Sequence, residues 1–308
     1  MKIRHRTLVP FDSQSTTRQR EEQHGLHPDD VYLKPGRIPH IWCPGCGLGV
    51  VLNTYINGLK MAGQPVDQSA VVSGIGCTGR VAGYLNMDTY HTTHGRAVPF
   101  ATGLALVRPD LTVTVFSGDG DLFAIGGNHF IHAARRNINL KIICVNNFNY
   151  GMTGGQAAPT TPVAARTTTT PYGNFEHSFN LPFLAYASGA VYVARWTTFH
   201  ARHLVTAIAE SLTRKGFTFI EVIAPCPIGY GRPNKLGSGL DEMKFYRENS
   251  LVRNDADPRE VDIGLKGKII VGKFIDQSRP TFDQVYAENI LKKFTRASEG
   301  DRKAIINN

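Results

Sequence analysis

Aspartate and asparagine side chains at the ends of two apolar segments are the residues of this 308-residue chain best placed for chemistry. Asp119 stands between Gly118 and Gly120, directly after an alternating β-branched segment, 111–116, which is typical of a buried strand. Asn147 ends a second apolar segment in the same way. Carboxylate and amide oxygens suit Mg²⁺, and the glycines let a loop backbone approach a diphosphate. The pattern predicts a magnesium and diphosphate site, although an ordinary α/β crossover with a glycine turn would also contain Gly-Asp-Gly alone.

Five cysteines are the second chemical feature. Cys43, Cys46, Cys77 and Cys226 lie in Gly/Pro-rich loops where thiolates can converge, whereas Cys144 lies inside an apolar strand and is predicted to be a small buried hydrophobe. The odd total and an N-terminus without a signal-peptide core argue against a secreted disulfide framework. One CxxC pair joined by two isolated cysteines favours a 4Fe-4S cluster, but the spacing alone leaves Zn²⁺ open.

Six motifs connect these two features along the chain. They are WCPGCG at 42–47, GIGCTGR at 74–80, HTTHGRAVPFATG at 91–103, SGDGD at 117–121, Asn-Asn and TGGQ within 146–156, and APCP at 224–227. Their order and spacing resemble the β subunit of 2-oxoacid:ferredoxin oxidoreductases, and Gly-Asp-Gly followed by Asn-Asn resembles the diphosphate motif of thiamine diphosphate (TPP) enzymes. The resemblance implies that Asp119, Asn147 and the backbone carbonyl of Asn149 hold Mg²⁺. It also implies that the four loop cysteines hold one 4Fe-4S cluster close to TPP.

Four further residues are candidates for the reaction itself. His94 and Arg96 fall at a predicted helix start, where they would face the reacting carboxylate or else tie down a loop. Arg80 would bind the distal carboxylate of 2-oxoglutarate, or else serve a salt bridge or the diphosphate. Leu122 would line the acyl pocket or belong to the core. The resemblance implies that TPP is contacted by Gly45, Gly47, Gly76, Gly118, Asp119, Gly120, Asp121, Asn147, Tyr150, Gly151, Met152 and Thr153.

The resemblance implies an enzyme that decarboxylates 2-oxoglutarate oxidatively, with coenzyme A, to succinyl-CoA, CO₂ and reduced ferredoxin, in a reversible reaction. Pyruvate or a broad range of 2-oxoacids is the alternative. TPP activation needs a carboxylate from a pyrimidine-binding domain, for which the chain has no room, so an α subunit is expected in a heterodimer or a dimer of heterodimers. The chain also has no CxxCxxCxxxCP run, so electrons must pass directly to ferredoxin or through another subunit.

Two other functions stay open on the residues alone. A non-redox TPP decarboxylase half would use the Mg²⁺ motif but leave the four loop cysteines without a role. A non-catalytic, zinc-stapled assembly protein would use the cysteines but leave Asp119 and Asn147 without one. Analysis of iron and sulfide separates the oxidoreductase from both, and TPP binding separates the second function from the third.

The net charge of +9, with a pI near 9.4, raises the question of nucleic-acid binding. The positive residues form no basic block, and no helix-turn-helix or RNA-binding motif is present, so we expect no nucleic-acid partner. Diffuse positive charge favours anionic substrates and an acidic ferredoxin. No apolar run approaches the ~20 residues that span a bilayer, so no membrane contact and a cytoplasmic location are expected.

The alternation of strand and helix patterns predicts an α/β, TPP-binding fold with a mainly parallel sheet and helices on both faces. Cofactor loops are expected at the carboxyl ends of the strands. We predict an N-terminal arm at 1–35, a TPP and iron–sulfur domain at 36–230 and a C-terminal docking tail at 231–308. Strands are predicted at 69–73, 111–116, 140–145, 190–193 and 217–223, and helices at 47–59, 98–107 and 200–214. One amphipathic segment follows at 282–294.

Overall fold

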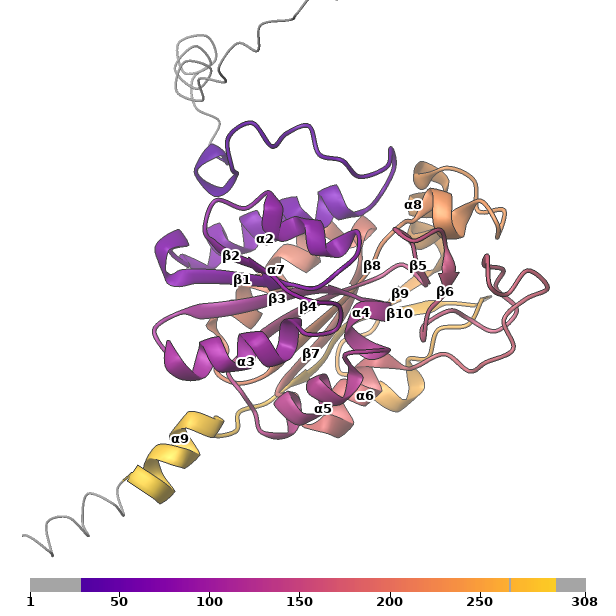
Figure 1. The fold of residues 1–308 in the computed structure, drawn as a ribbon. Coiled ribbons are helices and arrows are strands. Elements are labelled where there is room, and N and C mark those ends of the chain that lie inside the picture. Colours follow the sequence, from indigo (N-terminus) through magenta and orange to yellow (C-terminus); the bar gives the residue numbers. More distant parts are fainter. Residues whose placement is uncertain (1–28, 266, 292–308) are drawn as a thin grey trace, which may run out of the picture.

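An eight-stranded sheet lies at the centre of the computed structural model, which describes residues 29–265 and 267–291 (Figure 1). Its strands are β1 (Ser69–Ser73), β2 (Asp88–His91), β3 (Thr112–Gly118), β4 (Lys141–Asn146), β7 (Tyr192–Thr197), β8 (Thr218–Ile223), β9 (Ser250–Val252) and β10 (Ile269–Asp276). Across the sheet they follow the order β2-β1-β3-β4-β8-β7-β10-β9. The β7–β10 pair is antiparallel and the other neighbouring pairs are parallel, which confirms the predicted mainly parallel sheet.

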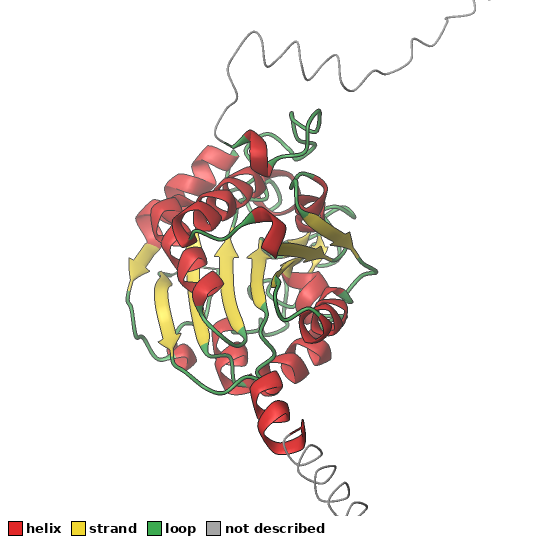
Figure 2. Cartoon of the chain, turned by 90° about the vertical axis from the view of Figure 1, so that its left-hand side faces the viewer, coloured by secondary structure: helices red, strands yellow, loops and turns green. Residues whose placement is uncertain are grey.

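Helices cover both faces of this sheet, as the sequence predicts (Figures 1 and 2). They are α2 (Leu48–Ala62), α3 (Ala97–Val107), α4 (Asp119–Phe123), α5 (Gly127–Arg135), α6 (Leu181–Ser188), α7 (Ala201–Thr213), α8 (Gly239–Asn249) and α9 (Phe282–Tyr286). The helices α2 and α7 pack together on one face, and α3, α5 and α6 lie on the other. Each face therefore has its own hydrophobic core.

Aromatic pairs anchor the two cores. On the α2 face, Tyr55 meets Phe116 of β3 edge-on, with ring centroids 4.9 Å apart. On the other face, Phe130 of α5 contacts Phe217 and Phe219 at 5.1 and 5.4 Å. The inner strands β1, β4, β7 and β8 are buried along their whole length, because helices cover both faces of a parallel sheet.

The segment before the sheet differs from the predicted arm where the structure describes it. Residues 1–28 lie outside the described residues. Residues 29–35 lie against the body rather than apart from it: Leu33 forms a β-bridge with Leu85, and the Lys34 N–H donates to the Tyr84 carbonyl at 2.8 Å. The described part of the arm is therefore packed.

The predicted boundary at residue 230 is also corrected. The helix α8 follows it, and β10 pairs with β7 inside the main sheet, so 239–276 belongs to the body and not to a separate tail. The amphipathic segment at 282–294 forms α9 and a π-helical turn, Ala287–Leu291, and its remainder lies outside the described residues. This helix extends away from the sheet (Figure 1). None of the helices described has the length and apolar character needed to cross a membrane.

Candidate active site at the carboxyl edge of the sheet

Four neighbouring strands deliver the four motif loops to one edge of the sheet. The strands β1, β3, β4 and β8 are adjacent and mutually parallel, so their carboxyl ends lie together. The Cys77 loop follows β1, Asp119 follows β3, Asn147 follows β4 and Cys226 follows β8. Segments more than 100 residues apart in the chain therefore meet at this edge, where parallel α/β sheets bind ligands.

Asp119 opens α4, directly after β3, and is only 2% exposed. The sequence predicts a loop around Gly118 and Gly120, which is wrong, because the chain passes from the extended Gly118 straight into helix. Glycine at 120 is required by packing, since an added Cβ would lie 2.3 Å from the Tyr150 ring. Burial raises the pKa of the Asp119 carboxyl from 3.8 to about 7. A divalent cation would hold such a desolvated carboxylate ionised, so the side chain suits a metal.

The second half of this site is the asparagine turn, residues 146–149. Asn147 and Asn149 are 9% and 3% exposed and flank Phe148, whose φ of 63° lies in the left-handed region. The Asn149 side-chain amide donates to the Asn147 carbonyl at 3.1 Å. Asn149 also begins the small hairpin of β5 (Asn149–Tyr150) and β6 (Gln156–Ala157). Both asparagines predicted to bind Mg²⁺ are thus held within one short turn.

Two threonines that the sequence analysis does not select join this turn to Asp119. The Thr160 hydroxyl donates to Asp119 Oδ2, and the neighbouring Thr161 hydroxyl donates to the Phe148 carbonyl at 2.7 Å. One short segment therefore fixes Asp119 and the asparagine turn relative to each other. Carboxylate, amide and hydroxyl oxygens are hard donors, which Mg²⁺ prefers, so this arrangement suits the predicted magnesium site.

Asp121 gathers three segments around its buried carboxylate. Its Oδ1 accepts hydrogen bonds from His94 Nδ1 at 2.5 Å, the Gly95 N–H at 2.7 Å and the Ile75 N–H at 3.2 Å. Its Oδ2 accepts from the Ser117 hydroxyl at 2.5 Å. Asp121 thereby joins the loop after β1, the turn before α3 and the start of α4. The sequence predicts a cofactor contact here, and the structure places protein donors on both carboxylate oxygens.

The other candidates for the reaction have different surroundings. The His94 side chain is 35% exposed, so its ring combines an anchored Nδ1 with access from outside. Arg96 is exposed and donates to the Ile125 carbonyl at 3.2 Å, a contact that ties down a loop. Arg80 is exposed beside Cys77, in the turn Thr78–Gly83. Leu122 is 2% exposed and packs in the core that includes α5.

Several predicted cofactor-binding residues surround the cysteines instead. An added Cβ at Gly47 would lie 2.7 Å from Pro225, and one at Gly151 would lie 3.3 Å from Cys226 Sγ. The next two candidates, Met152 and Thr153, are exposed on the hairpin. The remaining glycines, Gly45 and Gly76, have φ angles of 80° and 129°, so their backbone conformations favour glycine whatever they bind.

The four loop cysteines lie in one region beside this site. Cys43 is exposed and Cys46, Cys77 and Cys226 are partly buried, whereas Cys144 is fully buried in β4, as predicted. Burial, with smaller contributions from the thiols of the other three cysteines, raises the pKa of Cys46 to about 12. The structure does not close them around a single point: among the described residues, no three His, Cys, Asp or Glu side chains form a group that could hold a metal ion.

One contact connects the cysteines to the asparagine turn. The Cys226 thiol lies 3.8 Å from Asn149 Oδ1, within reach of a weak S–H hydrogen bond. The predicted cluster ligand Cys226 therefore contacts the side chain of Asn149, the residue whose backbone carbonyl is predicted to bind Mg²⁺. The soft thiols of the loop cysteines and the hard oxygens of the asparagine turn thus lie next to each other.

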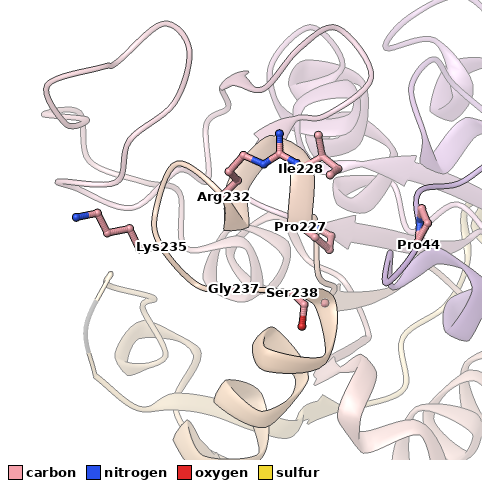
Figure 3. Close-up of a pocket in the computed structure, with 8 residues that line it drawn as sticks. Pro44, Pro227, Ile228, Arg232, Lys235, Gly237 and Ser238 are labelled. Carbon is pink, nitrogen blue, oxygen red and sulfur yellow. The ribbon is translucent and has the colours of Figure 1, made fainter.

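A pocket of about 480 Å³ is lined by residues next to Cys43 and Cys226 in the chain. Pro44 of the CxxC loop and Pro227, next to Cys226, face it from two segments, and the cationic Arg232 and Lys235 belong to its lining (Figure 3). Lys235 extends outward in this view. The lining includes no acidic residue, so its charge is positive.

Comparison with known proteins follows this geometry. Residues 57–222, more than half of the chain, match the family model of the thiamine pyrophosphate enzyme, C-terminal TPP binding domain. The fold and the site thus define a thiamine pyrophosphate enzyme. The chain is 52% identical over 259 residues to the 2-oxoglutarate synthase subunit KorB of Methanothermobacter marburgensis, a match that covers 83% of this chain and 90% of that one. It belongs to this family of KorB subunits.

Two further relatives agree with this family. The KorB subunit of Methanocaldococcus jannaschii is 51% identical over 258 residues, which is 83% of this chain and 95% of that one. A solved structure, the 2-oxoglutarate:ferredoxin oxidoreductase from Magnetococcus marinus with 2-oxoglutarate, coenzyme A and succinyl-CoA bound, has a TM-score of 0.76 and 32% sequence identity. That match covers 92% of this chain and 96% of the solved chain.

Proposed function

We propose that this chain is the subunit of a 2-oxoglutarate:ferredoxin oxidoreductase that carries TPP, Mg²⁺ and a 4Fe-4S cluster. The reaction is the oxidative decarboxylation of 2-oxoglutarate with coenzyme A to succinyl-CoA, CO₂ and reduced ferredoxin. The observation that carries the proposal is the 3.8 Å contact between the Cys226 thiol and Asn149 Oδ1. It brings the cysteines that would hold the cluster next to the oxygens that would hold Mg²⁺ and TPP, as electron transfer between two cofactors requires.

The oxygen donors would hold the diphosphate through Mg²⁺. Asp119, Asn147 and the carbonyl of Asn149 are the ligands, and Thr160 orients the carboxylate of Asp119. TPP, when bound, supplies a nucleophilic carbon and an electron sink. The four loop cysteines would hold the cluster, because soft thiolates bind iron–sulfur clusters while hard oxygens bind Mg²⁺.

His94 and Arg80 are proposed to act on the substrate. Because Nδ1 of His94 contacts Asp121, the ring is fixed, and its Nε2 is left to exchange a proton with the reacting groups. Asp121 is then a positioning residue. Arg80, exposed beside Cys77, would bind the distal carboxylate that 2-oxoglutarate has and pyruvate lacks.

The proposed assembly includes an α subunit with the pyrimidine-binding domain. The relatives are named as subunits, which supports a heteromeric enzyme. A cytoplasmic location agrees with the reduced thiols that cluster assembly needs.

Ferredoxin is proposed to dock at the pocket between Pro44 and Pro227. This pocket adjoins two of the proposed cluster ligands, Cys43 and Cys226, through their neighbours in the chain. The positive charge of its lining would attract an acidic electron carrier and orient it over the cluster.

Metal and cofactor analysis of the anaerobically purified complex tests this function. We expect about four iron and four acid-labile sulfide ions per chain, the content of one 4Fe-4S cluster, together with TPP and Mg²⁺. Zinc in place of iron would contradict the redox function. TPP without iron would indicate a non-redox TPP enzyme, and zinc without TPP an assembly protein.

A further inference from the structure

A charged pair lies in the interior of the sheet, where neither the fold nor the predicted chemistry calls for it. Arg195 of β7 and Glu221 of β8 stand directly opposite each other and are 1% and 0% exposed. Arg195 Nε donates to Glu221 Oε2 at 2.6 Å. A buried ion pair is seldom retained for stability alone, because the cost of desolvation offsets much of the attraction.

The pair continues to the asparagine turn. Asn146, the last residue of β4, donates from Nδ2 to Glu221 Oε1 at 2.7 Å, so protein donors occupy both carboxylate oxygens. Its own Oδ1 accepts from the Phe148 N–H at 3.1 Å. Asn146 therefore has one end fixed by the buried carboxylate and the other on the backbone between Asn147 and Asn149.

This backbone requires support. Phe148 has a φ of 63°, a left-handed conformation that is unfavourable for a residue with a large side chain. Such a conformation persists only where the surroundings impose it. Here the Phe148 N–H is held by Asn146 and its carbonyl by Thr161, so hydrogen bonds fix the peptide on both sides.

The other end of the network reaches β10, which lies next to β7 in the sheet. Arg195 Nη1 donates to the Val261 carbonyl at 2.5 Å and to the Ile270 carbonyl of β10 at 3.4 Å. The guanidinium is thus fixed by carboxylate and carbonyl oxygens, so its Nε–H donates to Glu221 from a fixed direction.

We infer that the Arg195–Glu221–Asn146 network is a positioning device that holds the asparagine turn in the conformation that presents Asn147 and the Asn149 carbonyl to Mg²⁺. These residues bind no ligand themselves and act through the turn. The inference rests on the proposed function, in which the turn supplies two of the Mg²⁺ ligands.

The test is TPP binding by the apo complex of this chain with its α subunit, measured by isothermal titration calorimetry at a series of Mg²⁺ concentrations. Asn146→Ala removes the hydrogen bonds to Glu221 and to the Phe148 N–H. Glu221→Gln keeps the shape of the side chain but removes its negative charge. We expect each to weaken TPP binding and to raise the Mg²⁺ needed for half-maximal affinity, by about tenfold or more for Asn146→Ala, as for other residues that orient metal ligands.

Asn137→Ala is the matched control. Asn137 is 2% exposed, has a φ of 50° and makes three side-chain hydrogen bonds, to the Arg279 and Pro280 carbonyls and from the Phe217 N–H, at the opposite edge of the sheet. It should lower the thermal midpoint without changing the Mg²⁺ dependence.

Three results are decisive. A changed Mg²⁺ dependence in Asn146→Ala and Glu221→Gln, but not in Asn137→Ala, supports the inference. If all three variants bind TPP like the wild type and lose only thermal stability, the network is structural and the inference is wrong. If the wild-type complex itself binds no TPP, the proposed function fails, and the inference fails with it.

Discussion

At the scale of single residues, Asp119 is the most important side chain of the proposed Mg²⁺ site. It is the one carboxylate among the three proposed Mg²⁺ ligands, and it is nearly inaccessible to solvent. Asp119→Ala should lower TPP affinity by about 100-fold, or ~2.8 kcal/mol, because the neutral ligands that remain bind Mg²⁺ weakly. Calorimetry on the apo complex measures this loss, and the iron content should be unchanged.

The control for this variant is Asp110→Ala, since Asp110 is exposed and pairs with Arg108 on the surface. It should change neither TPP affinity nor iron content. Loss of iron together with TPP in Asp119→Ala would show that the two sites do not form independently, contrary to the separate donor sets argued above.

Arg80 decides the substrate in this account. Arg80→Ala should raise the KM for 2-oxoglutarate by at least about tenfold, the weight of one hydrogen-bonded charge pair, and leave the KM for pyruvate nearly unchanged. Steady-state kinetics with both oxoacids tests the difference, with Arg108→Ala as the surface control. Equal effects on the two substrates would remove Arg80 from substrate recognition.

At the scale of elements, β4 combines two polar ends with an apolar middle. Lys141 opens the strand, 3% exposed, and Asn146 closes it. Burial lowers the pKa of Lys141 from 10.5 to about 7, although its ammonium group lies 3.0 Å from Asn139 Oδ1. Protonation of the Lys141 amine is therefore less favourable in the folded protein than in the unfolded chain.

The pH dependence of stability follows from this shift. Between about pH 7 and 10.5 the unfolded chain binds a proton at Lys141 that the folded chain does not, so the free energy of unfolding should rise with pH across this window. The slope is at most about 1.4 kcal/mol per pH unit. Lys141→Met should remove it in urea unfolding, whereas Lys235→Met, at an exposed lysine of the pocket lining, should not. Equal slopes in the wild type and Lys141→Met would contradict this assignment.

The strands also show what the sequence can predict. Strand β1 is predicted to the residue, because its short apolar run is bounded by polar and glycine residues. The predicted 190–193 strand is wrong at both ends, since β7 runs from Tyr192 to Thr197. Arg195 interrupts the apolar pattern of this strand. It can be buried because it pairs with Glu221, 26 residues further along the chain. A long-range pair of this kind has no local signal.

The same limit applies to the site. The motifs select the proposed ligands because their residue types are informative by themselves. They do not predict that Thr160 reaches Asp119, a contact across 41 positions, or that Asp121 binds the turn of His94. Such contacts depend on the order of the strands in the sheet. The packing of Tyr150 on Gly120 of α4, from another strand end, is a further contact of this kind.

At the scale of the whole molecule, the distribution of positive charge bears on the electron partner. Arg232→Glu combined with Lys235→Glu should raise the KM for ferredoxin by about tenfold or more at low salt and much less at high salt, because screening weakens attraction between exposed charges. Reduction of ferredoxin at several salt concentrations measures this effect.

The control is Lys215→Glu, which lies at the amino end of β8, on the edge opposite the pocket. It carries the same kind of charge reversal and should leave the KM for ferredoxin unchanged. A comparable rise in Lys215→Glu would show that overall charge, and not the pocket, controls the encounter.

The central claim, that one chain brings a TPP site and a cluster into contact, is tested most directly by electron paramagnetic resonance. The complex with the α subunit is purified anaerobically and given 2-oxoglutarate without coenzyme A. We predict the signal of a reduced 4Fe-4S cluster that depends on 2-oxoglutarate and is absent in Asp119→Ala. A signal with pyruvate but not with 2-oxoglutarate would overturn the substrate, and zinc in place of iron, with no signal from any 2-oxoacid, would contradict the account.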